Sequence, residues 1–335
     1  MSIAVSPALF AKLLCHWQQL QGRHHLPWQQ QPTPYRVLVA EVMLQQTQVN
    51  TVIDYYQRWM TRFPTLTDLY HAAEDDIMRH WQGLGYYQRA RRLQQAARYI
   101  VDECAGEFPS TLTNLLTVPG IGPYTAGAVM SFAYNQYGPI VDGNVKRFYS
   151  RYFGLDAPLN SKQSNDALWA HAERFTPKNN NRQFTQALLD IGAGICTRHQ
   201  PKCDQCPVQT TCFAYHQQQT ELLPVAAPKK KKTTLVLHFA WCENNQRLLL
   251  EKRAPDGIWG ALWCLPEIAE PPKSASEPLF TFTHALTHRQ IHAYVWRKHP
   301  LNALNLSEFA ATEINQLGLP TPIKQSIKVH LPPLR

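Results

Sequence analysis

Four cysteines gather in one short segment with the spacing Cys196-x6-Cys203-x2-Cys206-x5-Cys212, while the other four of the eight lie singly. A disulfide framework is typical of short secreted chains, and this 335-residue chain has no basic and apolar leader at its start. Four thiolates are the ligand set of a cubane iron–sulfur cluster or of a structural zinc ion. The spacing therefore predicts a structural metal centre in a protein of a reducing compartment.

Two carboxylates have the surroundings that acid catalysis needs. Glu41 interrupts the apolar run from 37 to 44, and burial there would raise its pKa and make it a general acid near neutral pH. The alternative is a partly exposed glutamate on an amphipathic helix. Asp142 precedes Gly143 and Asn144 at the expected start of a helix, where it is an N-cap, an ionised group that stabilises a cation, or both. Such a pair suits cleavage of a glycosidic bond.

A glycine-containing turn lies between two expected helices at 115–122. Gly120 and Gly122 allow a tight turn and a close approach of backbone to a ligand. The first N–H groups of the following helix can then bind an anion such as a phosphate, although Pro123 has no N–H to donate. The segment is either a hairpin that grips a nucleic-acid backbone or a plain turn between helices.

Helical patterns dominate from Leu9 to about Tyr215 and must position these residues. Thr33 and Pro34 predict an N-cap and the first residue of a helix that runs to roughly Trp59. Further helices are expected over 68–82, 89–104, 112–116, 124–134, 144–152, 164–175 and 181–192.

The pattern changes after a proline-flanked basic linker, Leu223–Lys232. Strands are expected over 235–241, 247–251 and 291–296, with a turn at 244–245, a loop over 271–278 and a helix over 307–317. We predict a helical domain over 1–222, a basic linker over 223–233 and a small α+β domain over 234–335.

Composition excludes a disordered chain, because hydrophobic residues make up 44% and charged residues 17%. The net charge is 33 − 24 = +9. Residues 1–225 carry 19 − 16 = +3 and residues 226–335 carry 14 − 8 = +6. A polyanion partner must then be held by local patches and backbone groups. Because no run of apolar residues is long enough to cross a membrane, we expect a cytoplasmic protein, associated with the nucleoid if it is bacterial.

Together these motifs resemble the endonuclease III-like superfamily of DNA glycosylases, and most closely its adenine DNA glycosylases, the MutY type. The resemblance covers nearly the whole chain, and it rests on Leu26-Pro-Trp28, Glu41–Val49, Gly83–Tyr87, Val118–Gly122, Val141–Arg147 and the cysteine spacing. It implies a multidomain fold, with a mostly α helix–hairpin–helix glycosylase domain (hairpin 112–134, iron–sulfur loop 196–212) and a smaller α+β Nudix-like domain. The cofactor it implies is one [4Fe–4S] cluster.

The resemblance also implies roles for residues of the catalytic pocket. Glu41 would protonate the flipped adenine on a ring nitrogen and help to activate water, and Asp142 would stabilise the oxocarbenium sugar. Asn144 would hydrogen-bond near that sugar, while Leu26 and Trp28 would line the adenine pocket. The implied partner is double-stranded DNA with 8-oxoguanine:adenine or guanine:adenine mispairs, bound by a monomer.

Further residues would contact the DNA and the lesion. Gln46 and Tyr86 would intrude into the duplex beside the lesion, where planar groups can stack. The family's lesion-reading loop usually ends in Phe-Ser-His, and here the sequence is Leu286-Thr287-His288. Thr287 keeps the hydroxyl group, whereas Leu286 replaces the aromatic ring.

Tyr124 distinguishes branches of the superfamily, because lyase-type members have there a lysine that forms a Schiff base with the sugar. A phenol cannot form that imine, so a monofunctional glycosylase is expected, with Lys146 as a possible adventitious trap. The C-terminal domain lacks the glutamate-rich Nudix signature, so no Mg²⁺-dependent hydrolysis of pyrophosphates is expected. The alternatives are an endonuclease III-type lyase and a non-catalytic, cluster-bearing DNA-binding protein.

Overall fold

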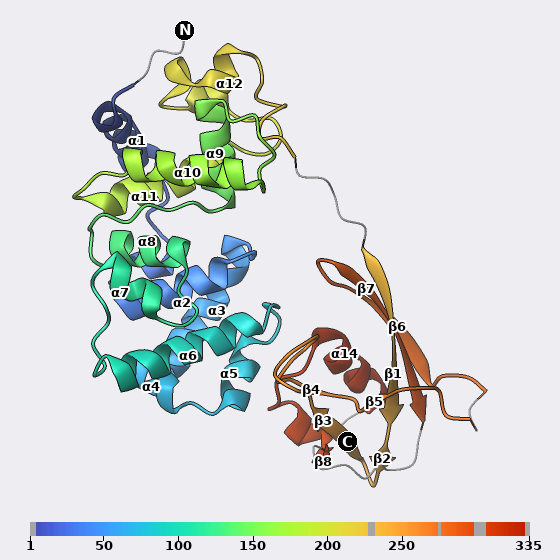
Figure 1. Ribbon diagram of the computed structural model, residues 1–335. Coiled ribbons are helices and arrows are strands. Elements are labelled where there is room, and N and C mark those ends of the chain that lie inside the picture. The colour runs from blue at the N-terminus through green and yellow to red at the C-terminus, as the bar shows by residue number, and fades with distance from the viewer. Residues whose placement is uncertain (1–4, 227–231, 274–275, 298–305, 332–335) are drawn as a thin grey trace. The chain divides into compact units, whose positions relative to one another are not determined.

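The computed structural model describes residues 5–226, 232–273, 276–297 and 306–331, and the chain divides into two compact units (Figure 1). The first unit comprises Met1–Tyr70 and Arg92–Pro228, and the second comprises His71–Arg91 and Lys229–Arg335. The boundaries predicted for the linker stay a prediction, since 227–231 lie outside the described residues. Within the described part, no helix combines the length and the apolar character that a bilayer crossing requires.

The first unit is built from helices, and its N-terminal helix packs against helices that lie more than 140 residues later in the chain. The helix α1 (Pro7–Gln21) packs on α10 (Lys162–Phe175) and α11 (Asn181–Asp190), and all three share one core with α9 (Gly143–Phe153) (Figure 1). Phe10 and Phe184 are fully buried in that core. The other helices are α2 (Pro34–Leu44), α3 (Val49–Arg62), α4 (Leu66–His71), α6 (Gln88–Glu103), α7 (Leu112–Thr117), α8 (Pro123–Phe132) and α12 (Phe213–His216).

Two predicted helices prove to be interrupted. Thr33 caps α2 as expected, with its hydroxyl accepting from the Arg36 N–H at 3.3 Å, but the helix ends at Leu44 and not near Trp59. Gln46 has a left-handed φ of +55°, and no glycine or proline marks the break in the sequence. The helix expected over 68–82 is divided into α4 and α5 (Glu74–Trp81), because Ala73 takes an extended conformation before an acidic first turn.

The second unit contains two four-stranded sheets, one with the order β5-β1-β7-β6 and one in which β3 pairs with β2, β4 and β8. Its helices are α5, α13 (Ala311–Ile314) and α14 (Thr321–His330). The strands are β1 (Thr233–Trp241), β2 (Glu243–Asn244), β3 (Arg247–Lys252), β4 (Trp263–Cys264), β5 (Glu267–Ile268), β6 (Phe280–Ala285), β7 (Arg289–Arg297) and β8 (Leu306–Ala310).

The C-terminal part differs from the sequence prediction at three elements. The helix expected over 307–317 begins as strand β8, because Phe309 and Ser307 pair with Leu248 and Leu250 of β3, and this pairing overrides local propensity. Strand β6 was not predicted, and it ends at Ala285, so that residues 286–288 form the turn before β7. The helix α14 was also missed. Part of the expected loop at 271–278, residues 274–275, lies outside the described residues.

Candidate active site

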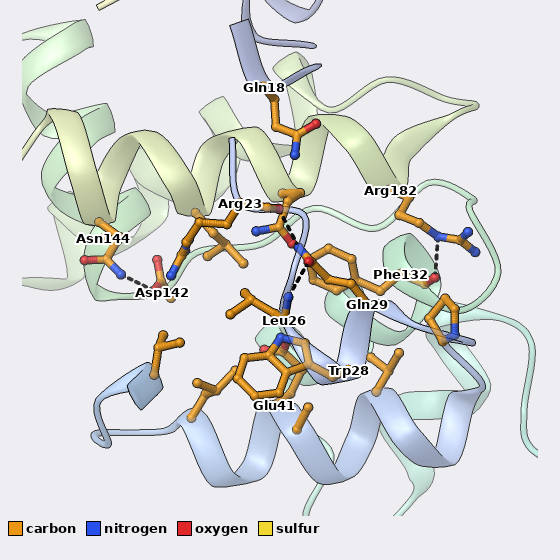
Figure 2. Close-up of a pocket in the computed structure, with 18 of the residues that line it drawn as sticks. Gln18, Arg23, Leu26, Trp28, Gln29, Glu41, Phe132, Asp142, Asn144 and Arg182 are labelled. Atoms are coloured by element: carbon orange, nitrogen blue, oxygen red, sulfur yellow. Dashed lines mark hydrogen bonds between the residues drawn. The ribbon is translucent and has the colours of Figure 1, made fainter. Parts of the chain in front are cut away.

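One pocket of the first unit, with a volume of about 1130 Å³, brings the predicted catalytic residues together (Figure 2). It is lined by seven residues singled out from the sequence, namely Leu26, Trp28, Glu41, Gln46, Tyr124, Asp142 and Asn144. Pockets that bind whole small molecules measure about 300–1,000 Å³, so this pocket is large enough to hold a nucleobase.

Glu41 is buried, with only 3% of its surface exposed, because α2 is apolar nearly all round. The Tyr124 hydroxyl, which comes from α8, donates to Glu41 Oε2 at 2.6 Å. Burial is the main reason that the pKa of Glu41 is raised to about 7. The hydrogen bond from Tyr124 limits this rise, and the nearby charge of Asp142 adds to it. Burial and the charge of Glu41 hold the pKa of Tyr124 well above 10, so the phenol remains the donor.

Asp142 is the N-cap of α9, and it is also in the pocket. Its Oδ1 accepts from the Val145 N–H at 2.7 Å, and its Oδ2 accepts from Asn144 Nδ2 at 3.2 Å. Burial raises the pKa of Asp142 above its ordinary value, and the backbone N–H groups of Val145 and Asn144 and the charge of Arg147 limit that rise. The pKa of Glu41 is lowered by one hydrogen bond alone, that from Tyr124. The site therefore favours a neutral Glu41 beside an ionised Asp142.

Arg147 connects the catalytic pocket with the cysteine loop. Its Nη2 donates to Asn144 Oδ1 at 3.0 Å and to the Gly192 carbonyl at 2.5 Å, and its Nε donates to the Cys196 carbonyl at 2.7 Å. Gly192 lies in the π-helical turn η2 (Ile191–Ile195), and a Cβ there would come within 2.6 Å of Asn144 Cβ. The π-helical turn thus sets the position of Asn144.

Leu26 and Trp28 form a wall of the pocket on the short helix η1 (Pro27–Gln29) and the residue before it. They are 2% and 8% exposed, and the Trp28 ring packs edge-on against Tyr56 at 5.6 Å between centroids. The sequence analysis missed the polar residues that hold this wall, which are Arg23, Gln29, Gln186 and Asp190. Nothing in the sequence pattern marks them, because they come together only when α11 packs beside the 23–29 segment.

The glycine hairpin has the geometry that its residue types require. Gly120 has a φ of +84°, and a Cβ there would lie 2.9 Å from Arg92 Cβ. Gly122 is the N-cap of α8 and would meet nothing within 4 Å, so the backbone there is open to a ligand. Pro123 occupies the first position of α8, which removes one N–H as expected.

The four cysteines lie on a loop that passes through the short helices η3 (Cys203–Gln205) and η4 (Gln209–Thr211). Arg151, only 2% exposed, donates from Nη1 to Cys196 Sγ at 3.4 Å and to the Thr197 carbonyl at 2.6 Å. The pKa of Cys206 is raised to about 12, mainly by burial and in smaller part by the charges of the other three thiols, so the four lie near one another. Among the described residues, no group of three or more His, Cys, Asp or Glu side chains is arranged to hold a single metal ion.

The remaining predicted DNA contacts lie in the second unit. Tyr86 has a φ of +48° and is 46% exposed, and its hydroxyl lies 2.6 Å from Thr287 Oγ1. Thr287 and the exposed His288 occupy the turn between β6 and β7, which the Leu286 N–H closes by donating to the Arg289 carbonyl at 2.8 Å. The structure thus brings together Tyr86 and Thr287, although the sequence separates them widely.

Comparisons with known proteins agree with this arrangement. Residues 39–173 match the HhH-GPD superfamily of base excision DNA repair proteins, and residues 238–329 match the NUDIX domain. The adenine DNA glycosylase of Buchnera aphidicola subsp. Baizongia pistaciae is 39% identical over 77% of this chain and 74% of its own length. The human adenine DNA glycosylase is 41% identical over 64% of this chain and 41% of its own length.

Solved structures support the helical fold. A thermostable thymine-DNA glycosylase matches with a TM-score of 0.57 and 29% identity, over 63% of this chain and 97% of that chain. Endonuclease III in a non-covalent DNA complex matches with a TM-score of 0.53 and 20% identity, over 64% of this chain and 99% of that chain. Sequence relatives and fold agree, and the chain belongs to the adenine DNA glycosylase family of base excision repair hydrolases.

Proposed function

We propose that this protein hydrolyses the N-glycosidic bond of adenine paired with 8-oxoguanine or guanine in double-stranded DNA, and leaves an abasic site. The observation that carries the proposal is the pair of unequal carboxylates in one pocket, a buried Glu41 with a pKa near 7 and an Asp142 held by backbone N–H groups. Glycosidic-bond cleavage needs one carboxyl group as an acid and one as a stabilising anion.

In the proposed reaction, Glu41 gives a proton to a ring nitrogen of the extruded adenine. Because Tyr124 donates to Oε2, the transferable proton is carried on Oε1. The electron pair of the C1′–N9 bond leaves with the base, and the carboxylate of Asp142 stabilises the oxocarbenium sugar. Water then attacks C1′ and loses its proton to the Glu41 carboxylate, which restores the acid. Leu26 and Trp28 cover the base, and Asn144 lies beside the sugar.

Tyr124 supports hydrolysis without lyase chemistry. At this position a phenol donates to Glu41 and offers no amine for a Schiff base. Lys146 is the amine nearest in sequence to Asp142, and its Nζ donates to Asn165 Oδ1 at 3.3 Å. A lyase reaction would require Lys146 to leave that contact.

The four thiols support a [4Fe–4S] cluster as the resident cofactor, held by Cys196, Cys203, Cys206 and Cys212. Buried thiols with raised pKa values are costly to ionise unless a cationic group binds them, and Arg151 adds a positive charge beside Cys196. Such a cluster would fix the loop that carries Arg147's acceptor, the Cys196 carbonyl. Double-stranded DNA as partner, the monomeric state and the cytoplasmic location accompany this proposal.

A single-turnover assay on an 8-oxoguanine:adenine duplex tests the function, with guanine:adenine and 8-oxoguanine:cytosine duplexes for comparison. We expect strand breaks only after hot alkali, and breaks without alkali would indicate a lyase. Glu41→Gln should lower the excision rate by about 10²–10⁴-fold and keep DNA binding. Lack of adenine release by the wild-type protein would refute the proposed function and leave the non-catalytic DNA-binding alternative.

A further inference from the structure

Asp190, the last residue of α11, is a buried carboxylate that accepts three hydrogen bonds from Arg23 and Gln186, two residues that line the pocket. It is 4% exposed. Its Oδ1 accepts from Arg23 Nε at 2.7 Å and from Gln186 Nε2 at 2.8 Å, and its Oδ2 accepts from the Arg23 backbone N–H at 2.9 Å. Two of these bonds come from the residue that begins the 23–29 segment.

The 23–29 segment is closed by its own hydrogen bonds onto that anchor. Gln29 Nε2 donates to the Arg23 carbonyl at 2.8 Å, and Gln29 Oε1 accepts from the Leu26 N–H at 3.0 Å (Figure 2). A continuous chain of contacts therefore runs from Asp190 through Arg23 and Gln29 to Leu26, the wall of the pocket. Gln186, the second partner of Asp190, lines the same pocket from α11.

We propose that Asp190 is a positioning residue for adenine excision, which holds the 23–29 segment against the pocket through Arg23 and fixes the amide of Gln186. The inference rests on the proposed function, because it assigns to the Leu26 and Trp28 wall the task of enclosing the base. Asp190 acts from behind that wall, and its buried anion is neutralised by Arg23.

The wall formed by Leu26 and Trp28 affects the pKa of Glu41 as well as the binding of the adenine. Glu41 owes its raised pKa first to burial, so a wall that moves outward lets water reach the carboxyl group and lowers that pKa. The charged and titratable groups around this pocket are Arg23, His24, Tyr124, Asp142 and Arg182. Of these, only Tyr124 and Asp142 contribute to the pKa of Glu41. Neither changes when Asp190 is altered, so a shift of the pH profile reports the movement of the wall.

The test uses the full-length Asp190→Asn protein, which keeps the shape of the side chain but removes its charge and one acceptor oxygen. At saturating enzyme on an 8-oxoguanine:adenine duplex, we expect the single-turnover excision rate to fall about 100-fold, as for a small misplacement of a catalytic pocket. The affinity for the duplex should stay within about twofold. The alkaline limb of the rate–pH profile should move to lower pH. An unchanged rate and profile of the folded protein would overturn the proposal.

Two further variants separate positioning from general loss of stability. Arg23→Gln breaks the side-chain part of the same connection from a residue whose side chain is 29% exposed, and it leaves the backbone N–H of Arg23 as a donor to Asp190. The double variant should be no slower than the slower single variant, because both break one connection. Asp76→Asn is the matched control, because it makes the same substitution in another aspartate–arginine pair, in which Asp76 Oδ1 lies 2.7 Å from Arg79 Nη2 in the second unit. Its excision rate and rate–pH profile should equal those of the wild-type protein.

Hydrogen–deuterium exchange of peptides that cover 23–29 tests the positioning without any reaction. Exchange there should quicken in Asp190→Asn and stay unchanged in α14 of the second unit. Unchanged exchange over 23–29 would refute the positioning role, whatever the activity. Faster exchange in a protein whose wild-type form releases no adenine would keep the positioning and refute the proposed function, so the two failures are distinguishable.

Discussion

Removing the hydroxyl of Tyr124 gives the sharpest test of how the acid is tuned. In Tyr124→Phe, Glu41 loses its 2.6 Å donor and keeps its buried position on α2. The donor stabilises the ionised form of Glu41 more than the neutral form, and it therefore lowers the pKa of that group. Its removal must raise the pKa of Glu41 above its present value of about 7.

The size of the shift follows from the strength of the bond. A hydrogen bond to a charged group contributes about 1.5–3 kcal/mol, and one pKa unit corresponds to about 1.4 kcal/mol. The pKa of Glu41 should then rise by about one to two units. Since excision needs the protonated acid, the rate falls as the pH rises through this pKa. The alkaline limb of the profile should move by the same one to two units to higher pH.

The measurement is the single-turnover excision rate on an 8-oxoguanine:adenine duplex across the pH range in which the enzyme stays folded. Tyr134→Phe serves as the matched control, because it removes a tyrosine hydroxyl that donates to the Phe108 carbonyl at 3.0 Å and does not line the pocket, and its limb should stay in place. A limb that moves to lower pH would mean that water replaces the phenol beside Glu41. A limb that does not move would mean that Glu41 is not the group that titrates. Either result refutes the reasoning.

Three other changes test separate parts of the structure. The pKa of Glu41 is raised from 4.5 to about 7, so its contribution to the free energy of unfolding is complete below pH 4.5 and is lost as the pH rises through 7. Glu41→Gln should therefore make the melting temperature less sensitive to pH. At pH 8 the variant should melt at a higher temperature than the wild-type protein, by the equivalent of about 3 kcal/mol. Gly192→Ala should slow excision at unchanged DNA affinity, because its Cβ would collide with Asn144, and an unaffected rate would show that Asn144 yields freely. Gly120→Ala, with a φ of +84° at that position, should lower the free energy of unfolding by about 1–2 kcal/mol and weaken duplex binding in filter or anisotropy assays, whereas a plain structural turn would leave binding unchanged.

The local parts of the site were predictable because they depend on short segments. The N-cap role of Asp142 and the burial of Glu41 follow from neighbours within one helical turn, and the structure confirms both. The hairpin was predictable for the same reason, since Gly120 and Gly122 mark it in the sequence. The meeting of Glu41 with Asp142 was not, because spacing along the chain does not give the packing of α2, α8 and α9.

The incorrect sequence predictions concern features that depend on contacts between distant segments or on a conformation that the residue type does not indicate. The helix ends after Leu44 because Gln46 adopts a left-handed conformation, which a glutamine in the sequence does not predict. The segment at Leu306–Ala310 has residues that a helix also accepts, and only its pairing with β3 makes it a strand. The anchor at Asp190 depends on side chains from α11 and from the 23–29 segment, which are far apart in the chain.

The two carboxylates differ because their backbone positions differ. Glu41 lies inside a helix, where every N–H is already bonded to the preceding turn, so the backbone offers this carboxylate nothing and burial dominates its pKa. Asp142 lies one position before a helix, where unbonded N–H groups point at its oxygens and favour the charged form. Exchanging the two residue types would leave a short carboxyl inside α2 and a longer one that no longer caps α9. The positions of the two residues relative to α2 and α9 therefore determine that Glu41 is the acid and Asp142 the anion.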